Sequence, residues 1–299
     1  MSREISVFSR WLLASRPRTL PAAIAPIVLG SALAAHQHAF QPAPALLCAA
    51  FALLAQIGAN FANDYFDFRR GADAPGRLGP TRAVASGLIS PRAMLGATFL
   101  VLALAAIFGC ALITYGGWVI ILLGVVSLLA ALAYTGGPFP LAYHGLGEVA
   151  ALVFFGYVAV LGTFYVQAGS PLPPVAWLAA TACGLLAANI LLVNNVRDFA
   201  SDARAGKRTL VVRFGRQFAH RLYAFNVATA LATPVFFLIA GFNPLVLVAL
   251  AELPLGLLLA RFLAATPDGD GLRFNKLLAQ SAQFLALWAG LMSLGIMFG

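Results

Sequence analysis

The sequence predicts an all-α, polytopic membrane protein, a bundle of about nine transmembrane helices that forms a single domain over residues 1–299. Hydrophobic residues make up 61% of the chain and charged residues 10%, against about 45–50% and about 25% in soluble domains. The apolar residues form runs of about 20, the length that a helix needs to cross a bilayer. This composition excludes a disordered chain, a disulfide-rich secreted scaffold and a soluble nucleic-acid-binding protein, although the formal charge is +9.

Each predicted span is an apolar run that lies between turn signals or charged residues. The spans are expected near 20–37, 43–63, 92–113, 117–134, 146–167, 174–194, 219–240, 243–263 and 277–298.

With one exception, the loops between these spans fall into two kinds, which supports the count of nine. The exception is Thr135 to Gly145, which falls on the basic side but has no formal charge and contains His144. Loops near 36–43, 114–117, 168–174 and 241–243 contain no Lys, Arg, Asp or Glu. The N-terminus and loops 64–92, 197–221 and 261–276 hold all 19 basic residues. Because basic loops stay in the cytoplasm, we expect a cytoplasmic N-terminus and cytoplasmic acidic loops at 64–92 and 197–221. The expected location is the inner, cytoplasmic membrane.

A cleavable signal peptide is the alternative interpretation of the N-terminus. Four arginines precede an apolar stretch that ends in small residues, as in a secretory signal. Pro21 and Pro26 interrupt that stretch, and the eight later spans carry their own insertion signals, so a first transmembrane helix is the favoured interpretation.

Charged residues concentrate in two short islands, Asp64 to Arg92 and Arg197 to Arg221, which hold 17 of the 29 charges. Between Ala93 and Val196 the one charged residue is Glu148. Polar chemistry in this chain is therefore expected at the two islands.

Each island begins with carboxylates and amides at helical spacing. Asn60, Asp64 and Asp67 are four and three residues apart and share one face if the second span continues as a helix. Asp73 follows. Asn194, Asp198 and Asp202 share a face in the same way, and Asp198 lies 134 residues after Asp64.

Carboxylates that converge on one membrane face repel each other unless a cation lies between them. Mg²⁺ suits such a site, because it binds through one or two carboxylates and keeps positions for water or substrate phosphates. Basic residues in the same islands suit an anionic phosphate group: Arg69, Arg70, Arg77, Arg82, Arg197, Arg204, Lys207 and Arg208. Solvated aspartates at helix ends are the simpler explanation, but two spaced repeats with paired asparagines favour a diphosphate site.

These motifs resemble the UbiA superfamily of intramembrane aromatic prenyltransferases, and more narrowly its MenA branch, which prenylates 1,4-dihydroxy-2-naphthoate in menaquinone synthesis. The likeness extends over two thirds of the chain. It rests on Arg16-Pro17-Arg18-Thr19-Leu20-Pro21, on Asn63-Asp64-Tyr65 through Arg77-Leu78-Gly79-Pro80, on Gly145-Leu146-Gly147-Glu148, and on Asn194-Asn195-Val196-Arg197-Asp198 through Gly206-Lys207-Arg208-Thr209-Leu210.

The resemblance implies roles for individual residues. The catalytic and metal-binding set would be Asp64, Asp67, Asp198 and Asp202, and the substrate-binding set Asn60, Asn63, Arg77, Arg82, Tyr134, Asn194, Arg197 and Lys207. Two positions depart from the superfamily pattern: Gly71 and Gly206 stand where further acidic residues are expected. Both departures fit the MenA branch but leave a metal role for Asp73 open.

The implied reaction is Mg²⁺-dependent transfer of a polyprenyl group from polyprenyl diphosphate to dihydroxynaphthoate, with release of diphosphate and CO₂. Another aromatic acceptor, 4-hydroxybenzoate or homogentisate, is the first alternative. A transporter is the second, although transporters place their charged sites near mid-membrane, whereas these carboxylates lie at helix ends. His144 and Glu148 are candidates for orienting the aromatic substrate or taking its phenolic proton, and Glu252 has no assigned role.

Overall fold

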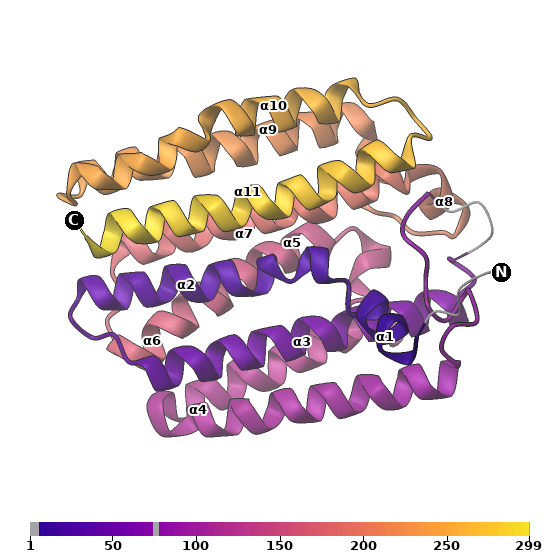
Figure 1. Cartoon of the computed structure of the whole chain (residues 1–299), viewed down its shortest axis with the longest axis horizontal. Helices are drawn as coiled ribbons and strands as arrows, with labels where there is room; N and C mark the ends of the chain where they lie inside the picture. The colour runs from indigo at the N-terminus through magenta and orange to yellow at the C-terminus, as the bar shows by residue number, and fades with distance from the viewer. Residues whose placement is uncertain (1–5, 74–77, 299) are drawn as a thin grey trace.

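The computed structural model describes residues 6–73 and 78–298, and within these residues every regular element is helical (Figure 1). The elements are α1 Val7–Ser15, η1 Pro17–Thr19, α2 Pro21–His36, α3 Pro42–Arg69, α4 Pro91–Ala133, η2 Leu141–His144, α5 Gly147–Ala151, the π-helix η3 Leu152–Leu161, α6 Gly162–Ala168, α7 Pro174–Arg197, α8 Phe199–Arg204, α9 Leu210–Ile239, η4 Pro244–Glu252, α10 Leu253–Ala265 and α11 Gly271–Met297.

The chain is a multi-pass membrane protein. Among the described residues, seven helical segments are long and apolar enough to cross a bilayer, and the pair formed by residues 7–19 and α2, bent by 51°, makes eight. Helix α4 supplies two crossings, because its backbone is non-helical at Gly117 (φ 59°, ψ −151°). The ring of Phe51 packs against both Gly109 and Gly124, and the ribbon of α4 turns back on itself in Figure 1. The two halves of α4, before and after Gly117, correspond to the predicted spans 92–113 and 117–134.

The helix boundaries agree with the predicted spans and differ most at the end of α3 and at the starts of α9 and α11. Helix α3 continues to Arg69, six residues beyond the predicted end, and α7 continues to Arg197. Helix α9 begins at Leu210 but is non-helical at Gly215, close to the predicted start of its span. In Figure 1, α1 and α8 lie at one end of the bundle and the turn of α4 lies at the other. The charged islands therefore gather at one end.

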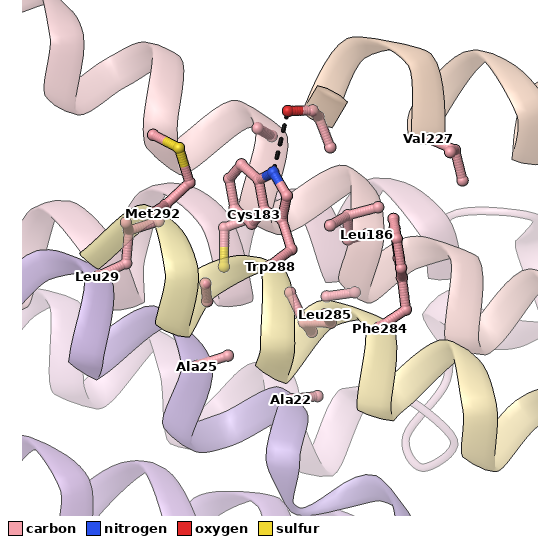
Figure 2. Packing of buried hydrophobic residues seen from close by; sticks show 14 of the residues in the cluster. Ala22, Ala25, Leu29, Cys183, Leu186, Val227, Phe284, Leu285, Trp288 and Met292 are labelled. Atoms are coloured by element: carbon pink, nitrogen blue, oxygen red, sulfur yellow. Dashed lines mark hydrogen bonds between the residues drawn. The ribbon is translucent and has the colours of Figure 1, made fainter. Parts of the chain in front are cut away.

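Helix α11 passes between α2 and the pair α9 and α10, and its contacts with α2, α7 and η4 form the core (Figure 1). Figure 2 shows Trp288 at the centre of this packing. Its indole N–H donates to the Ala230 carbonyl oxygen on α9 at 3.0 Å. That carbonyl lacks its helical partner because Pro234, four residues later in the same helix, has no N–H. Trp288 thus satisfies a buried acceptor that the proline leaves open.

The π-helix η3 and α7 approach each other at two glycines. A Cβ on Gly184 would lie 2.7 Å from the Leu152 carbonyl oxygen and 2.9 Å from the Gly156 Cα. Neither backbone atom can rotate away, so only glycine permits this approach. Small residues at helix contacts are typical of membrane bundles. This contact fixes η3, which directly continues α5 and its Glu148, against α7, which carries Asn194.

Candidate active site

The last turns of α3 present the first predicted cluster on one buried face. Helix α3 continues to Arg69, which confirms that Asn60, Asp64 and Asp67 lie on one helix, and the three residues are 6%, 2% and 1% exposed. Asn60 donates to the Ser15 carbonyl oxygen at 2.9 Å. This bond ties α3 to the N-terminal segment.

Asp64 holds the loop that follows α3. Its two carboxylate oxygens accept the backbone N–H groups of Ala83 (3.0 Å) and Val84 (3.3 Å). The carboxylate is buried against this loop and is not among the side chains that line the polar cavity described below. Its role as a metal ligand stays a prediction.

Asp67 is the centre of the site. Its carboxylate lies 3.0 Å from Nζ of Lys207 and 3.3 Å from Nη2 of Arg82. The hydroxyl of Tyr143 donates to it at 3.0 Å. Arg82 also contacts Asp73 at 3.2 Å. Cationic side chains of the protein itself therefore compensate the charges of Asp67 and Asp73.

The second cluster lies where α7 gives way to α8. Asp198 separates the two helices, but its N–H donates to the Asn194 carbonyl and its own carbonyl accepts from the N–H of Asp202, so helical hydrogen bonding continues. All three side chains line one cavity, as their spacing predicted. Arg197 donates to Asp198 at 2.7 Å and also to Asn194 and Asn275. Arg197 thus holds the side chains of Asp198 and Asn194 in position.

The two clusters meet, as predicted. Nζ of Lys207 lies 3.0 Å from Asp67 on α3 and 3.9 Å from Asp202 on α8. It also lies 4.8 Å from the centre of the Tyr143 ring, on which the Arg70 guanidinium stacks at the same distance. Side chains more than 130 residues apart therefore share one small volume.

This volume is a cavity of about 40 Å³, which we call the polar chamber. Five carboxylates and two cationic side chains line it. Its lining is Asn63, Asp67, Ala72, Asp73, Arg82, Tyr134, Thr135, Ala142, Gly147, Glu148, Leu191, Asn194, Asn195, Asp198, Ser201, Asp202, Lys207 and Thr209.

Several lining residues hold buried polar atoms that have no hydrogen-bond partner among the described residues. They are Oδ1 of Asn63, Nη1 of Arg82, Oγ1 of Thr135 and Oε2 of Glu148. A buried polar group without a partner is costly and rare in native proteins. Their concentration around one cavity indicates that the chamber is shaped for a polar ligand.

A second cavity, which we call the apolar chamber, adjoins the first and has a volume of about 300 Å³. Four residues line both chambers: Asn63, Tyr134, Gly147 and Leu191. The apolar chamber extends between α2, α3, α4 and the segment α5–α6, and aromatic rings such as Phe51, Phe154 and Phe155 line it. A ligand with a charged head and a long apolar tail fits this pair of cavities.

The polar chamber also fits a hard divalent cation. No three His, Cys, Asp or Glu side chains of the described ranges are arranged as a ready-made metal cluster. Mg²⁺ does not need one, because it binds through one or two carboxylates together with substrate phosphates. The carboxylates outnumber the cations of the lining, and all of its anionic donors are oxygen atoms. The donor set is therefore the one that Mg²⁺ prefers.

The predicted substrate-binding residues divide between the two chambers. Asn63 and Tyr134 lie where the chambers meet, and Asn60 lines only the apolar one. Arg82, Asn194 and Lys207 line the polar chamber, whereas Arg197 supports Asp198 without lining it. Arg77 lies outside the residues that the structure describes.

The sequence analysis assigned no site role to Thr135 or Asn195, and it named Glu148, together with His144, as a candidate for orienting the aromatic substrate or taking its phenolic proton. Nδ2 of Asn195 donates to Oε1 of Glu148 at 2.8 Å. Glu148 was noticed because it is the one charge in a long apolar stretch. The doublet Asn194-Asn195 was the available signal for the partner.

The loop tyrosine of the site remains protonated at physiological pH. Burial raises the pKa of Tyr143 well above its ordinary value, and the charge of Asp67 raises it further. Tyr143 therefore serves as a hydrogen-bond donor that fixes the Asp67 carboxylate.

Comparison with known proteins assigns the family. The sequence profile of the UbiA prenyltransferase family matches residues 23–296. The chain belongs to this family. The resemblance noted from the motifs is thereby confirmed, and the UbiA match extends well beyond Leu210, where the motifs end.

Two bacterial relatives with similar sequences share one name, and a human relative has another. The 1,4-dihydroxy-2-naphthoate octaprenyltransferase of Escherichia coli is 44% identical over 228 residues, which cover 74% of each chain. The protein of the same name from Mycobacterium tuberculosis is 43% identical over 253 residues, 84% of each chain. The UbiA prenyltransferase domain-containing protein 1 of Homo sapiens is 31% identical over 71% of this chain and 63% of its own.

Solved structures confirm the UbiA fold. A UbiA homologue from Aeropyrum pernix superposes with a TM-score of 0.70 at 18% identity and covers 91% of this chain and 96% of its own. A UbiA homologue from Archaeoglobus fulgidus bound to DMAPP and Mg²⁺ has a TM-score of 0.62 at 19% identity, with 95% and 99% covered. The predicted bundle is the fold of these intramembrane proteins.

Proposed function

We propose that this UbiA-family protein transfers a polyprenyl group from polyprenyl diphosphate to 1,4-dihydroxy-2-naphthoate, with release of diphosphate and CO₂, in menaquinone biosynthesis. The observation that carries the proposal is the junction of the two chambers, since a polyprenyl diphosphate has an anionic head on an apolar tail. The names of the relatives support the naphthoate acceptor.

In this proposal the polar chamber holds the diphosphate together with Mg²⁺. The carboxylates of Asp67, Asp198 and Asp202 would hold the metal, as the donor set of the chamber supports. Bound Mg²⁺ supplies positive charge that stabilises the diphosphate as it leaves. Arg82 and Lys207 would exchange their contacts with Asp67 for contacts with phosphate oxygens, which charge-assisted hydrogen bonds favour.

The apolar chamber would protect the reacting carbon from water. Loss of diphosphate leaves an allylic cation, which water would capture. The rings of Tyr134, Phe154 and Phe155 line the chamber, and aromatic faces attract a cation while apolar walls exclude water. The electron-rich ring of the acceptor then attacks the allylic carbon. The acceptor must enter beside the junction for the two carbons to meet.

We also propose that the polar chamber opens to the cytoplasm and that the membrane is the inner membrane. The positive-inside distribution of the basic residues supports this orientation. Alkaline phosphatase fused after Gly117 should be active, and the same enzyme fused within 205–208 should be inactive. The reverse pattern would contradict the orientation.

The test of the activity uses purified protein in lipid nanodiscs with Mg²⁺, a polyprenyl diphosphate and dihydroxynaphthoate. We expect release of diphosphate and formation of a prenylated quinol. In the mass spectrum this product should be lighter by one CO₂ than dihydroxynaphthoate that has gained the prenyl group and kept its carboxylate. Parallel reactions with 4-hydroxybenzoate and homogentisate compare the acceptors. Asp198→Asn should reduce turnover at least a hundredfold while thermal unfolding shows a folded protein, because the amide is a poor ligand for Mg²⁺.

The matched control is Asp270→Asn, which changes a solvent-accessible aspartate far from both chambers in sequence and should leave turnover unchanged. Full activity in excess EDTA would contradict the metal assignment. Faster prenylation of 4-hydroxybenzoate or homogentisate than of dihydroxynaphthoate would contradict the assigned acceptor.

A further inference from the structure

Glu148 is a buried carboxylate that the proposed handling of diphosphate does not use. Its side chain belongs to a residue that is 6% exposed. One oxygen, Oε1, accepts from Nδ2 of Asn195 at 2.8 Å. The other, Oε2, is buried and has no partner among residues 6–73 and 78–298. In its ionised form a carboxylate is purely an acceptor, so in that form Oε2 offers a position for a hydrogen-bond donor.

The position of Glu148 places this acceptor beside the junction of the chambers. Glu148 lines the polar chamber, and the residue before it, Gly147, lines both chambers. Tyr134 is also shared by the two chambers and lies beside Gly147. The reacting carbon of a prenyl diphosphate connects its charged head to its tail. The head and tail fit the two chambers, so that carbon belongs at the junction.

The charges around Glu148 differ from those around the other acidic residues of the chamber. Asp67 and Asp198 each form an ion pair with a basic side chain, whereas Glu148 forms none within the described part of the chain. Its fixed partner is a neutral amide. This carboxylate would repel an anionic phosphate, whereas a neutral hydroxyl group would supply the donor that Oε2 lacks.

We propose that Oε2 of Glu148 accepts a hydrogen bond from a ring hydroxyl of the aromatic acceptor and holds the ring at the junction of the chambers. This inference rests on the proposed function and adds the subsite that orients the acceptor. Asn195 fixes the carboxylate by its bond to Oε1, which leaves Oε2 directed to the substrate.

The test is the substitution Glu148→Gln, studied by direct binding. A glutamine keeps a carbonyl oxygen for Asn195 but places an NH₂ group where Oε2 stands, and NH₂ cannot accept a hydrogen bond. Equilibrium binding is measured with two probes: 1,4-dihydroxy-2-naphthoate, and 2-naphthoate, which lacks the ring hydroxyls. We expect the variant to bind dihydroxynaphthoate about tenfold or more weakly and 2-naphthoate with unchanged affinity.

The matched control is Glu252→Gln. Glu252 also has a buried Oε2 without a partner among the described residues, but it lines neither chamber. This variant should bind both probes as the wild type does. Thermal unfolding of both variants reports whether they fold. Equal weakening of both probes by Glu148→Gln, or no weakening of either, would overturn the inference.

Turnover separates this inference from the proposed function. With Glu148→Gln, the KM for dihydroxynaphthoate should rise about tenfold, while the KM for polyprenyl diphosphate and the half-saturating Mg²⁺ concentration stay within twofold of wild type. A rise in the last two instead would assign Glu148 to the diphosphate and metal, and would overturn the inference. Wild-type protein that binds dihydroxynaphthoate but transfers no prenyl group would contradict the proposed function alone.

Discussion

Removal of the Asp67 charge should destabilise the ligand-free protein more than any change to an exposed ion pair. Asp67 is almost completely buried, with ammonium and guanidinium groups at 3.0 Å and 3.3 Å. At an effective dielectric constant near 20, each contact corresponds to about 5 kcal/mol of Coulomb energy, much of which offsets the cost of burying the charges. Breaking a buried pair by removing one partner costs about 3–5 kcal/mol.

We expect Asp67→Asn to lower the free energy of unfolding by about 3 kcal/mol, the lower end of that range. Arg82 keeps Asp73 at 3.2 Å, and the Lys207 side chain is 12% exposed, so neither cation is left wholly without compensation. The asparagine still accepts the hydrogen bond from Tyr143. The substitution therefore isolates the charge.

Unfolding in mixed detergent micelles, followed by circular dichroism, measures this difference. The control is Asp270→Asn, because Asp270 and Arg273 form an ion pair 33% and 56% exposed. Asparagine still caps α11 at that position. Exposed pairs contribute under about 1 kcal/mol. If Asp67→Asn lowers the free energy of unfolding no more than this control does, the ion pairs of Asp67 with Lys207 and Arg82 do not stabilise the fold.

Two further predictions concern stability. Trp288→Phe leaves the Ala230 carbonyl unsatisfied and should lower the free energy of unfolding by about 1–3 kcal/mol beyond the lost packing. In a Pro234→Ala background, where the helix regains an N–H for that carbonyl, the same substitution should lower it by less. An equal loss in both backgrounds would refute the explanation. Because burial and Asp67 raise the pKa of Tyr143 in the folded state, the phenol stabilises the fold below its ordinary pKa, and this contribution is lost as the pH rises through the folded value. The tyrosinate absorbance of the wild type is measured against pH, and that of Tyr143→Phe is subtracted from it. The difference should show one group that titrates well above pH 10. Titration at the ordinary value would contradict the assignment of Tyr143 as a buried hydrogen-bond donor.

The fold could be predicted from the sequence because two independent signals agree. Apolar runs gave the spans, and the absence of charge from alternate loops supported their count. The boundary between 113 and 117 was visible because a single glycine pair separates two long apolar runs. Hydropathy did not predict the extension of α3 to Arg69, because the added turns are polar. Asp64 and Asp67 in these turns are held by contacts with residues far along the chain.

The sequence predicted which acidic residues lie at the site, but not which groups they contact. The spacing of Asp198 and Asp202 identified the second cluster, because helical periodicity is a local property. The bond between Asn195 and Glu148 joins residues 47 apart, and the N–H groups that hold Asp64 come from a loop about 20 residues later. Such contacts depend on how the helices pack, which no local pattern records.

The wide turns of η3 have a consequence for the direction of Glu148. In a π-helix each hydrogen bond encloses one residue more than in an α-helix, and this form extends over the ten residues that follow α5. One residue advances an α-helix by about 100° around its axis. Deleting a single residue from this stretch would thus rotate the α5 turn relative to α6 and swing Glu148 away from the junction, with every remaining side chain chemically unchanged. The number of residues in this stretch, as much as their identity, determines where the carboxylate points.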